Sequence, residues 1–250
     1  MTEETPSYEQ PWPAWEPLWL CDYSVESMCK TLGGMEDQGG PRLSRRKLRL
    51  FTAACLRRIQ RVFKDQRNRR FIDTVEEHAD GLITYEENSR RLGQLADPPN
   101  ADAPTNPDDP NYPCEDNPVE CACTAMVFAV GERMIGYDAY TAAAWAALAA
   151  DNQEEEGAAQ VSLLRCIFGN PFRPVALNPA WRTPTVTALA TAAYDERELP
   201  AGTLDPERLA VLADALEDAG CDKADILSHL RGPGPHVRGC FVLDLLLGRK

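Results

Sequence analysis

The sequence predicts an all-α fold, either an irregular multi-helix bundle or a short α-solenoid-like array with Pro-rich connections. Three observations support this prediction. Apolar residues recur at three- and four-residue intervals in several segments, no segment shows the apolar–polar alternation of a half-buried strand, and helix-start and helix-stop residues bracket the apolar stripes. With 250 residues, 44% of them hydrophobic, the chain is long enough to bury a substantial core.

The first predicted region, residues 1–96, contains three helices. One begins after Ser44, a favourable N-cap, and carries a clear apolar stripe. Another begins near Asn68, and Thr84 is placed to cap the third. Before them, residues 32–40 are rich in glycine but lack the Lys-Ser/Thr ending of a phosphate-binding loop, so we expect a flexible connection there.

A change of composition separates this region from the next. Residues 97–118 contain seven prolines and six acidic residues, which no helix or central strand tolerates, so a linker or a long loop is expected. Helical patterns resume over 119–168, a segment that we expect to pack on the first region. The segment includes the alanine-rich run 138–150, which has the highest intrinsic helix propensity in the chain.

Residues 169–250 are predicted to form a C-terminal helical module. Prolines punctuate its start, and Thr183 and Asp205 each precede a proline in the arrangement typical of an N-cap followed by the first helical turn. Asp222 is expected to cap a short helix. After the turn sequence GPGP, a last buried helix is expected over 236–248.

The most informative feature of the sequence is its segregated charge. Residues 42–70 carry twelve Lys and Arg against one acid, Asp65, although the net charge of the chain is −13. Such a tract must be neutralised by the protein's own acidic surface, by a partner protein or by nucleic acid. The candidate binding residues are Arg46, Arg49, Arg57, Arg58, Arg61 and Lys64.

Nucleic-acid binding and internal neutralisation differ in the residues that the tract should contain. Arginines pair with phosphates in a bidentate manner, which makes nucleic-acid binding through 42–70 an alternative. However, no aromatic residues interleave with the arginines and no helix-turn-helix is evident. We therefore favour internal neutralisation by acidic segments such as 97–116, 195–198 or 214–218.

Two groups of phrases resemble those of a large bacterial family for which we know of no established activity. The tract RRKLRLFTAACLRRI at 45–59 is similar to the RKLRLFACACCRRIW-type tract that opens members of that family. Further along, IFGNPFRP, AYDER, LADALEDAGC, ILSHL and RGPGPHVRGCFVLDLLLG resemble its C-terminal module, with Phe241 where members often have Trp. The resemblance covers a little under half of the chain and implies membership of that family, but no particular activity.

Residues 221–240 contain the candidate site chemistry. Four residues that could ligate a metal fall within this stretch, namely Cys221, His229, His236 and Cys240. Their spacing is not that of a zinc finger, because the paired C-x2–4-C knuckle is absent. His236 and Cys240 would share a helix face if the last helix began at residue 236. The alternative is that both cysteines are core thiols and His229 lies on a helix surface.

The same stretch allows a thiol nucleophile. Cys240 and His236 could form a thiolate–imidazole pair, with Arg238 between them. Against this, the apolar run after Cys240 favours burial, which raises the pKa of a thiol, and no third residue is evident to orient the histidine.

From these patterns we predict a non-enzymatic protein-interaction or regulatory module that acts on an unknown protein partner and needs no cofactor. The alternatives are nucleic-acid binding through 42–70 and a metal- or Cys-dependent enzyme at 221–240. No run of 18 apolar residues and no signal peptide are visible, so we expect a cytoplasmic protein with mostly reduced thiols and no membrane association.

Overall fold

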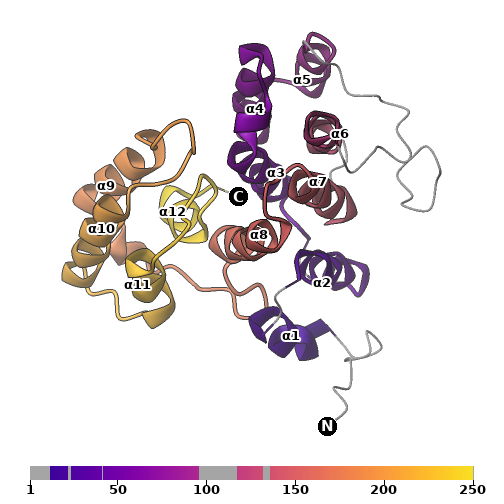
Figure 1. The fold of residues 1–250 in the computed structure, drawn as a ribbon. Coiled ribbons are helices and arrows are strands. Elements are labelled where there is room, and N and C mark those ends of the chain that lie inside the picture. The colour runs from indigo at the N-terminus through magenta and orange to yellow at the C-terminus, as the bar shows by residue number, and fades with distance from the viewer. Residues whose placement is uncertain (1–11, 22–23, 41, 96–116, 132–135, 250) are drawn as a thin grey trace.

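The computed structural model describes residues 12–21, 24–40, 42–95, 117–131 and 136–249, and this part of the chain is an all-α multi-helix bundle (Figure 1). The predicted fold class is therefore confirmed. Most of the predicted linker, 97–118, lies outside the described residues. The α-helices are α1 (Glu16–Cys21), α2 (Val25–Asp37), α3 (Arg45–Arg58), α4 (Gln66–Ala79), α5 (Tyr85–Leu92), α6 (Pro118–Val130), α7 (Gly136–Leu148), α8 (Gln153–Phe168), α9 (Pro184–Asp195), α10 (Pro206–Asp218), α11 (Ala224–Arg231) and α12 (Phe241–Leu247).

Helix α3 is the central element of the fold. It packs against α4, α6, α7 and α8, and the side chains of Phe51, Cys55 and Leu56 are fully buried. The same helix carries much of the basic tract. Because other helices cover α3 on several sides, its arginines have few routes to solvent. The segment 119–168 contacts the first region, since α6, α7 and α8 all contact α3.

The C-terminal helices join the bundle through α12. In Figure 1, α9, α10 and α11 lie together on one side, and α12 lies between them and α8. Helix α12 contacts α8, α9 and α11, and its Val242 and Leu243 are completely buried. One hydrophobic cluster runs from Trp19 to Leu246 and includes residues from both halves of the chain.

Most predicted helix starts are confirmed because their signals are local. The Ser44 hydroxyl accepts a hydrogen bond from the backbone N–H of Lys47, and Thr84 and Asp205 cap α5 and α10 through their side chains. The expected cap at Asp222 is wrong. Helix α11 begins one residue later, after Lys223, which makes no side-chain cap.

The glycine-rich stretch at 32–40 is not the flexible connection that its composition predicts. Helix α2 continues through Gly33 and Gly34 to Asp37. The reason is a close approach, since a Cβ atom on Gly34 would lie 2.8 Å from two atoms of the buried Trp15 ring. Glycine here makes room for a tryptophan rather than breaking the helix.

The last helix is shorter than predicted. Helix α12 begins at Phe241, and residues 236–240 form an irregular connection in which Val237 makes an isolated bridge with Thr203. Gly239 has a φ of +90°, and a Cβ atom there would lie 2.8 Å from Leu50. This left-handed conformation interrupts the helix, so His236 and Cys240 do not share a helix face.

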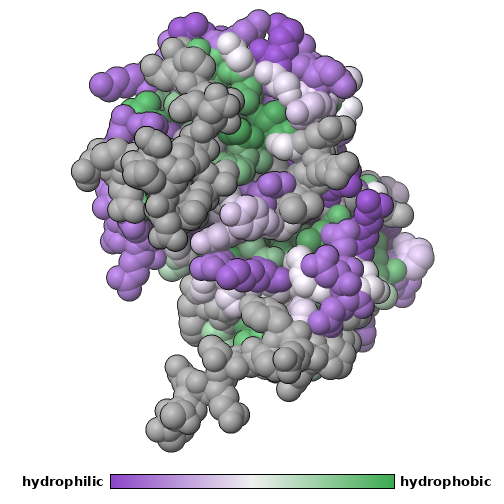
Figure 2. All heavy atoms as spheres, turned by 90° about the vertical axis from the view of Figure 1, so that its right-hand side faces the viewer, coloured by the Kyte–Doolittle hydropathy of each residue, from purple (hydrophilic) through white to green (hydrophobic). Residues whose placement is uncertain are grey.

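The surface of the molecule is mixed in polarity. Figure 2 shows one face, on which hydrophilic residues are widespread among the described residues and hydrophobic ones are visible between them. Among the helices that the structure describes, none combines the length and apolar character needed to cross a bilayer.

The two adjacent glycines of α2 offer a matched test of this packing. We expect Gly34→Ala to lower the free energy of unfolding by about 1–3 kcal/mol, because the new methyl group overlaps the Trp15 ring. A Cβ atom on Gly33 would meet no neighbour within 4 Å, so Gly33→Ala should be neutral or stabilising by up to about 1 kcal/mol. Denaturant unfolding measures both, and equal effects of the two substitutions would contradict the proposed contact.

Candidate functional site

The basic tract is neutralised largely within the molecule. Its central contact joins Arg57 of α3 to Glu76 of α4 in a bidentate pair, in which Arg57 Nε donates to Oε1 at 2.8 Å and Nη2 donates to Oε2 at 2.9 Å. Both side chains are only 5% exposed. The same guanidinium also donates to Asp73 at 2.6 Å and to the carbonyl oxygen of Pro200 at 3.3 Å.

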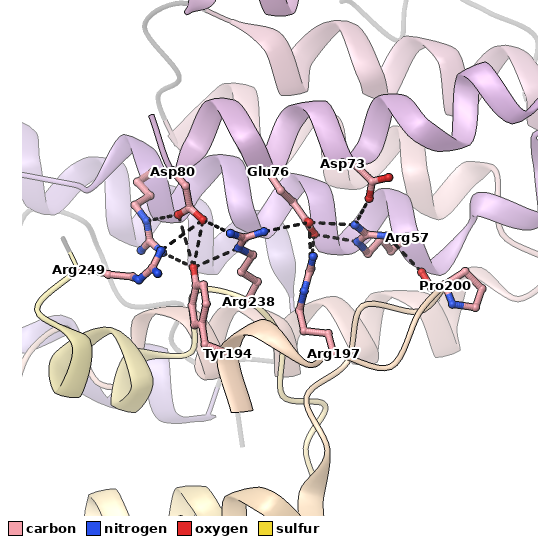
Figure 3. Close-up of polar contacts among 10 residues, drawn as sticks. Arg57, Asp73, Glu76, Asp80, Tyr194, Arg197, Pro200, Arg238 and Arg249 are labelled. Atoms are coloured by element: carbon pink, nitrogen blue, oxygen red, sulfur yellow. Dashed lines mark hydrogen bonds and ion pairs between the residues drawn. The ribbon is translucent and has the colours of Figure 1, made fainter. Parts of the chain in front are cut away.

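The C-terminal module supplies further arginines to the same carboxylate. Arg197 Nη1 donates to Glu76 Oε1 at 2.9 Å, and Arg238 Nη1 lies 3.8 Å from Oε2. Figure 3 shows these side chains reaching α4 from the segment after α9 and from the connection before α12. Glu76 is thus a buried junction between the two halves of the chain.

A second junction forms at Asp80, just after α4. Arg46 Nε donates to Asp80 Oδ1 at 2.8 Å, Arg238 forms an ion pair with Oδ2, and Arg249 Nη1 lies 3.5 Å from the same oxygen. The Tyr194 hydroxyl lies 3.4 Å from both carboxylate oxygens. We call the combined set the buried ion network: Arg46, Arg57, Asp73, Glu76, Asp80, Tyr194, Arg197, Arg238, Asp244 and Arg249.

Arg46 extends this network into α12. Its Nη1 donates to Asp244 Oδ2 at 2.7 Å, and its Nη2 donates to the Tyr194 hydroxyl at 2.6 Å. Two guanidinium groups also lie over the Tyr194 ring, that of Arg249 at 4.2 Å and that of Arg238 at 5.1 Å from the ring centroid. Such contacts add a cation–π attraction to the ion pairs.

The other predicted binding residues are distributed as follows. Arg58 pairs with Glu156 at 2.8 Å, Arg61 pairs with Asp151, Arg49 donates to the Gly131 carbonyl oxygen at 3.2 Å, and Lys64 is exposed. Internal neutralisation is therefore the main arrangement, as favoured from the sequence. Among the described residues, the acidic partners of these side chains lie in or next to α4, α8 and α12 and not in 195–198 or 214–218. The third predicted segment, 97–116, lies outside the described residues.

A second cluster lies at the start of α12. Cys166, His229, His236 and Cys240 each direct one ligand atom to a common point, and these four atoms lie within 4.8 Å of one another. We call them the Cys/His cluster. Its members come from the last turn of α8, from α11, from the connection after GPGP and from the N-cap position of α12.

Two of the distances in the cluster lie close to those expected around a tetrahedral metal ion. His229 Nε2 lies 3.3 Å from Cys240 Sγ, and Cys166 Sγ lies 3.9 Å from His236 Nδ1. A zinc ion about 2.0–2.3 Å from each ligand atom holds those atoms about 3.3–3.8 Å apart. Two thiols and two imidazoles are also the donor set that zinc prefers in structural sites.

Both imidazole rings are held in orientations that suit ligation. His236 Nε2 lies 3.2 Å from the Gly232 carbonyl oxygen; this bond requires a proton on Nε2 and leaves Nδ1 free as a ligand, a second contact typical of metal-bound histidine. The His229 ring packs edge-on against His236 at 4.7 Å and tilted against Phe241 at 4.6 Å between centroids. Gly234, with φ +77°, allows the chain to turn here, because a Cβ atom would lie 2.9 Å from the His236 nitrogen.

The cluster also stabilises negative charge on sulfur. Burial alone raises the pKa of the Cys240 thiol, but hydrogen bonds from Cys166, His229 and His236 outweigh burial and hold this pKa well below its ordinary value. The pKa of the Cys166 thiol is raised, because Cys166 is the donor in its interaction with Cys240 and is also buried. Lys47 of α3 donates to the Ile167 carbonyl oxygen at 2.8 Å, which places a cation close behind the two sulfurs.

The four residues of the Cys/His cluster differ in one member from the four metal ligands predicted from the sequence. His229, His236 and Cys240 come together as candidate ligands, whereas Cys221 is buried beyond the end of α10 and lies outside the cluster. Its place is taken by Cys166, which sequence spacing could not reveal because it lies in a different helix far along the chain. Arg238, considered beside Cys240 as part of a catalytic pair, belongs instead to the buried ion network.

A pocket of about 450 Å³ opens onto one side of the cluster. Three cluster members, Cys166, His229 and His236, line it together with Trp19 and Phe241. Cys240 is fully buried behind them. The eight cysteines in the described part of the chain all carry free thiols, so both cluster sulfurs are available as ligands.

Comparisons with family models, curated proteins and solved structures return no match to this chain. The resemblance noted in the sequence thus stays a prediction, and the chemistry of the site is inferred from its own geometry.

The Glu76 junction gives a matched pair of substitutions. We expect Glu76→Gln to lower the free energy of unfolding by about 3 kcal/mol, because it leaves Arg197 buried without its carboxylate and leaves Arg57 paired only with the half-exposed Asp73. The neighbouring Glu77 is 40% exposed and pairs with Arg91, so Glu77→Gln should cost less than about 1 kcal/mol. Urea denaturation of both variants decides this, and losses of similar size would refute a buried junction.

The Glu76 carboxylate should also affect how the free energy of unfolding depends on pH under acidic conditions. Burial raises the pKa of Glu76, but hydrogen bonds and ion pairs with Arg57 and Arg197 outweigh it and hold the pKa below 4.5. A depressed folded-state pKa contributes stability that is present above the unfolded-state value and is lost as the pH falls through the folded-state value. The difference in unfolding free energy between wild type and Glu76→Gln should therefore be full near neutral pH and shrink below pH 4.5. A constant difference from neutral pH down to about pH 3 would exclude this role.

Proposed function

We propose that the protein is a non-enzymatic helical module whose C-terminal part is held in place by one zinc ion bound to the Cys/His cluster. The observation that carries the proposal is the convergence of four ligand atoms, within 4.8 Å of one another, from four separate segments of the chain. A shared metal ion accounts for two thiols and two imidazoles meeting from four segments of the chain.

The number of ligands supports a structural rather than a catalytic metal. Catalytic zinc sites use three protein ligands and keep one position open for water or substrate, whereas structural sites are closed by four. Here the fourth position is filled by Cys240, whose side chain is fully buried. Zinc would tie α8, α11 and the start of α12 together, which fixes the connection 232–240 that contains few regular backbone hydrogen bonds.

A thiol nucleophile is the alternative chemistry of the same residues. It would need the Cys240 sulfur to face a substrate, but the lining of the adjacent pocket includes Cys166, His229 and His236 and not Cys240. The His229 imidazole contacts the Cys240 sulfur directly, and its ring packs against Phe241 rather than against a carboxylate that would orient it. These contacts favour ligation over nucleophilic attack.

The proposal keeps the role predicted from the sequence, an interaction or regulatory module, and leaves the partner protein as a prediction. Phosphate binding by the basic tract receives less support, because four of its six candidate binding residues already contact carboxylates of the same chain. The metal would hold the C-terminal helices in one arrangement, and any partner would recognise the surface that this arrangement presents.

Metal content of the purified full chain tests the proposal. Elemental analysis should find about one zinc per chain in the wild type, and His236→Ala and Cys240→Ser should lose most of it because three ligands rarely hold a structural ion. Cys221→Ser is the matched control, since this buried thiol lies outside the cluster, and it should retain zinc. A wild-type protein that binds no transition metal under reducing conditions with added zinc would end the proposal.

Removing the metal should also weaken the fold. Binding to the folded state alone adds stability by mass action, about 4 kcal/mol at a thousand-fold excess over the dissociation constant. A strong chelator should therefore lower the melting temperature of the wild type by roughly 10 °C, with no further effect on His236→Ala. An unchanged melting temperature in a protein shown to lose its zinc would contradict a structural role.

A further inference from the structure

The Cys/His cluster contains two thiols that could also bond to each other. Cys166 and Cys240 lie on different segments, yet their sulfur atoms belong to the same group of ligand atoms within 4.8 Å of one another. A disulfide needs the two sulfurs to approach to about 2.05 Å. One of them, Cys240, lies in the irregular connection just before α12, where small backbone shifts need not break a helix.

One of the two cysteines lines a pocket that opens to solvent, although the residue itself is only 2% exposed. The pocket of about 450 Å³ beside the cluster is lined by Cys166, whereas Cys240 is fully buried and is not part of the lining. A molecule as small as a peroxide fits a space of this size many times over, since a water molecule occupies about 30 Å³. The two thiols therefore differ in access, although they belong to one site.

We propose that the zinc site of the proposed function is a peroxide-sensitive clasp, which releases zinc when Cys166 and Cys240 are oxidised to a disulfide. This inference rests on the proposed zinc site. The unequal access of the two sulfurs assigns their order, with Cys166 reacting first with the peroxide and Cys240 resolving the product.

The chemistry balances with hydrogen peroxide as the oxidant. In the zinc-loaded protein both sulfurs would be thiolates, because a cysteine must be deprotonated to ligate the metal. The Cys166 thiolate attacks one peroxide oxygen, an S–O bond forms, the O–O bond breaks, and the departing hydroxide takes up a proton from solvent to give water. The Cys240 thiolate then attacks the oxidised sulfur, an S–S bond forms, the S–O bond breaks, and a second hydroxide leaves and is protonated. In total two thiolates, one hydrogen peroxide and two protons give one disulfide and two waters, and the two sulfurs supply both electrons.

Loss of the thiolates removes the metal. A disulfide has no anionic sulfur to offer, so only His229 and His236 remain, and two imidazoles do not complete a tetrahedral site. The connection 232–240 and α11 would then lose this attachment and keep only their packing and the ion pairs of Arg238 and Arg231. Oxidation should therefore loosen this part of the C-terminal module and leave the buried ion network in place, because none of its members belongs to the cluster.

The test uses the zinc-loaded full chain, hydrogen peroxide as the probe and a colorimetric zinc chelator as the readout. We expect zinc release to rise in step with a Cys166–Cys240 disulfide mapped by mass spectrometry, and a thiol reductant with added zinc should reverse both. The exposed Cys21 serves as the internal control for general thiol oxidation. Zinc that stays bound at peroxide levels that fully oxidise Cys21, or release without this disulfide, would overturn the inference.

Two variants test the assigned order. In Cys240→Ser, oxidation should stop at a sulfenic acid on Cys166, which a dimedone-type reagent labels, because the resolving thiol is missing. In Cys166→Ser, Cys240 should stay unlabelled because the pocket does not reach it. Labelling of Cys240 but not Cys166 would reverse the order and refute the access argument.

These outcomes separate the inference from the proposal on which it rests. Zinc that binds but survives peroxide leaves the structural zinc site standing and rejects the clasp. A chain that binds no zinc rejects the zinc site, and the clasp with it, whether or not the disulfide forms.

Discussion

The buried pairing of Arg57 with Glu76 is the constraint on which the rest of the arrangement depends. A charge that is withdrawn from water without a partner costs several kcal/mol, so neither side chain tolerates burial alone. The pair forms only when α3 and α4 pack side by side, and Arg197 reaches the same carboxylate only when the C-terminal helices dock on them. The positive tract therefore helps to specify one arrangement of the two halves, in which charge pairing and apolar packing agree.

The Cys/His cluster provides a second attachment between the C-terminal helices and the rest of the bundle. The buried ion network joins α3 and α4 to the C-terminal helices through carboxylates and guanidinium groups, whereas the cluster joins α8 to α11 and α12 through sulfur and imidazole. The first depends on ionisation of carboxylates, and the second, in the proposed zinc site, would depend on the oxidation state of thiols. Two chemically independent attachments thus hold a small set of helices whose apolar contacts are shared with the main core.

The sequence was informative where the cause was local and uninformative where it was distant. Caps such as Ser44 and Thr84 act within four residues, so the corresponding helix starts could be predicted. Internal charge neutralisation could be expected, but not the choice of Glu76, because nothing in a helix pattern shows which acid a second helix will cover. Three of four cluster residues lie within one short stretch and were identified, whereas Cys166 enters only through tertiary packing.

Helix α12 has a consequence for how the chain can evolve. Cys240 precedes the helix and Asp244 lies about one turn into it, so a sulfur and a carboxylate with different partners are separated by a fixed length of helix. Inserting or deleting a single residue between them would rotate one relative to the other by about 100°. Residues 241–243 can then be replaced by residues of similar size, but their number cannot change. We expect relatives that keep both attachments to preserve this spacing.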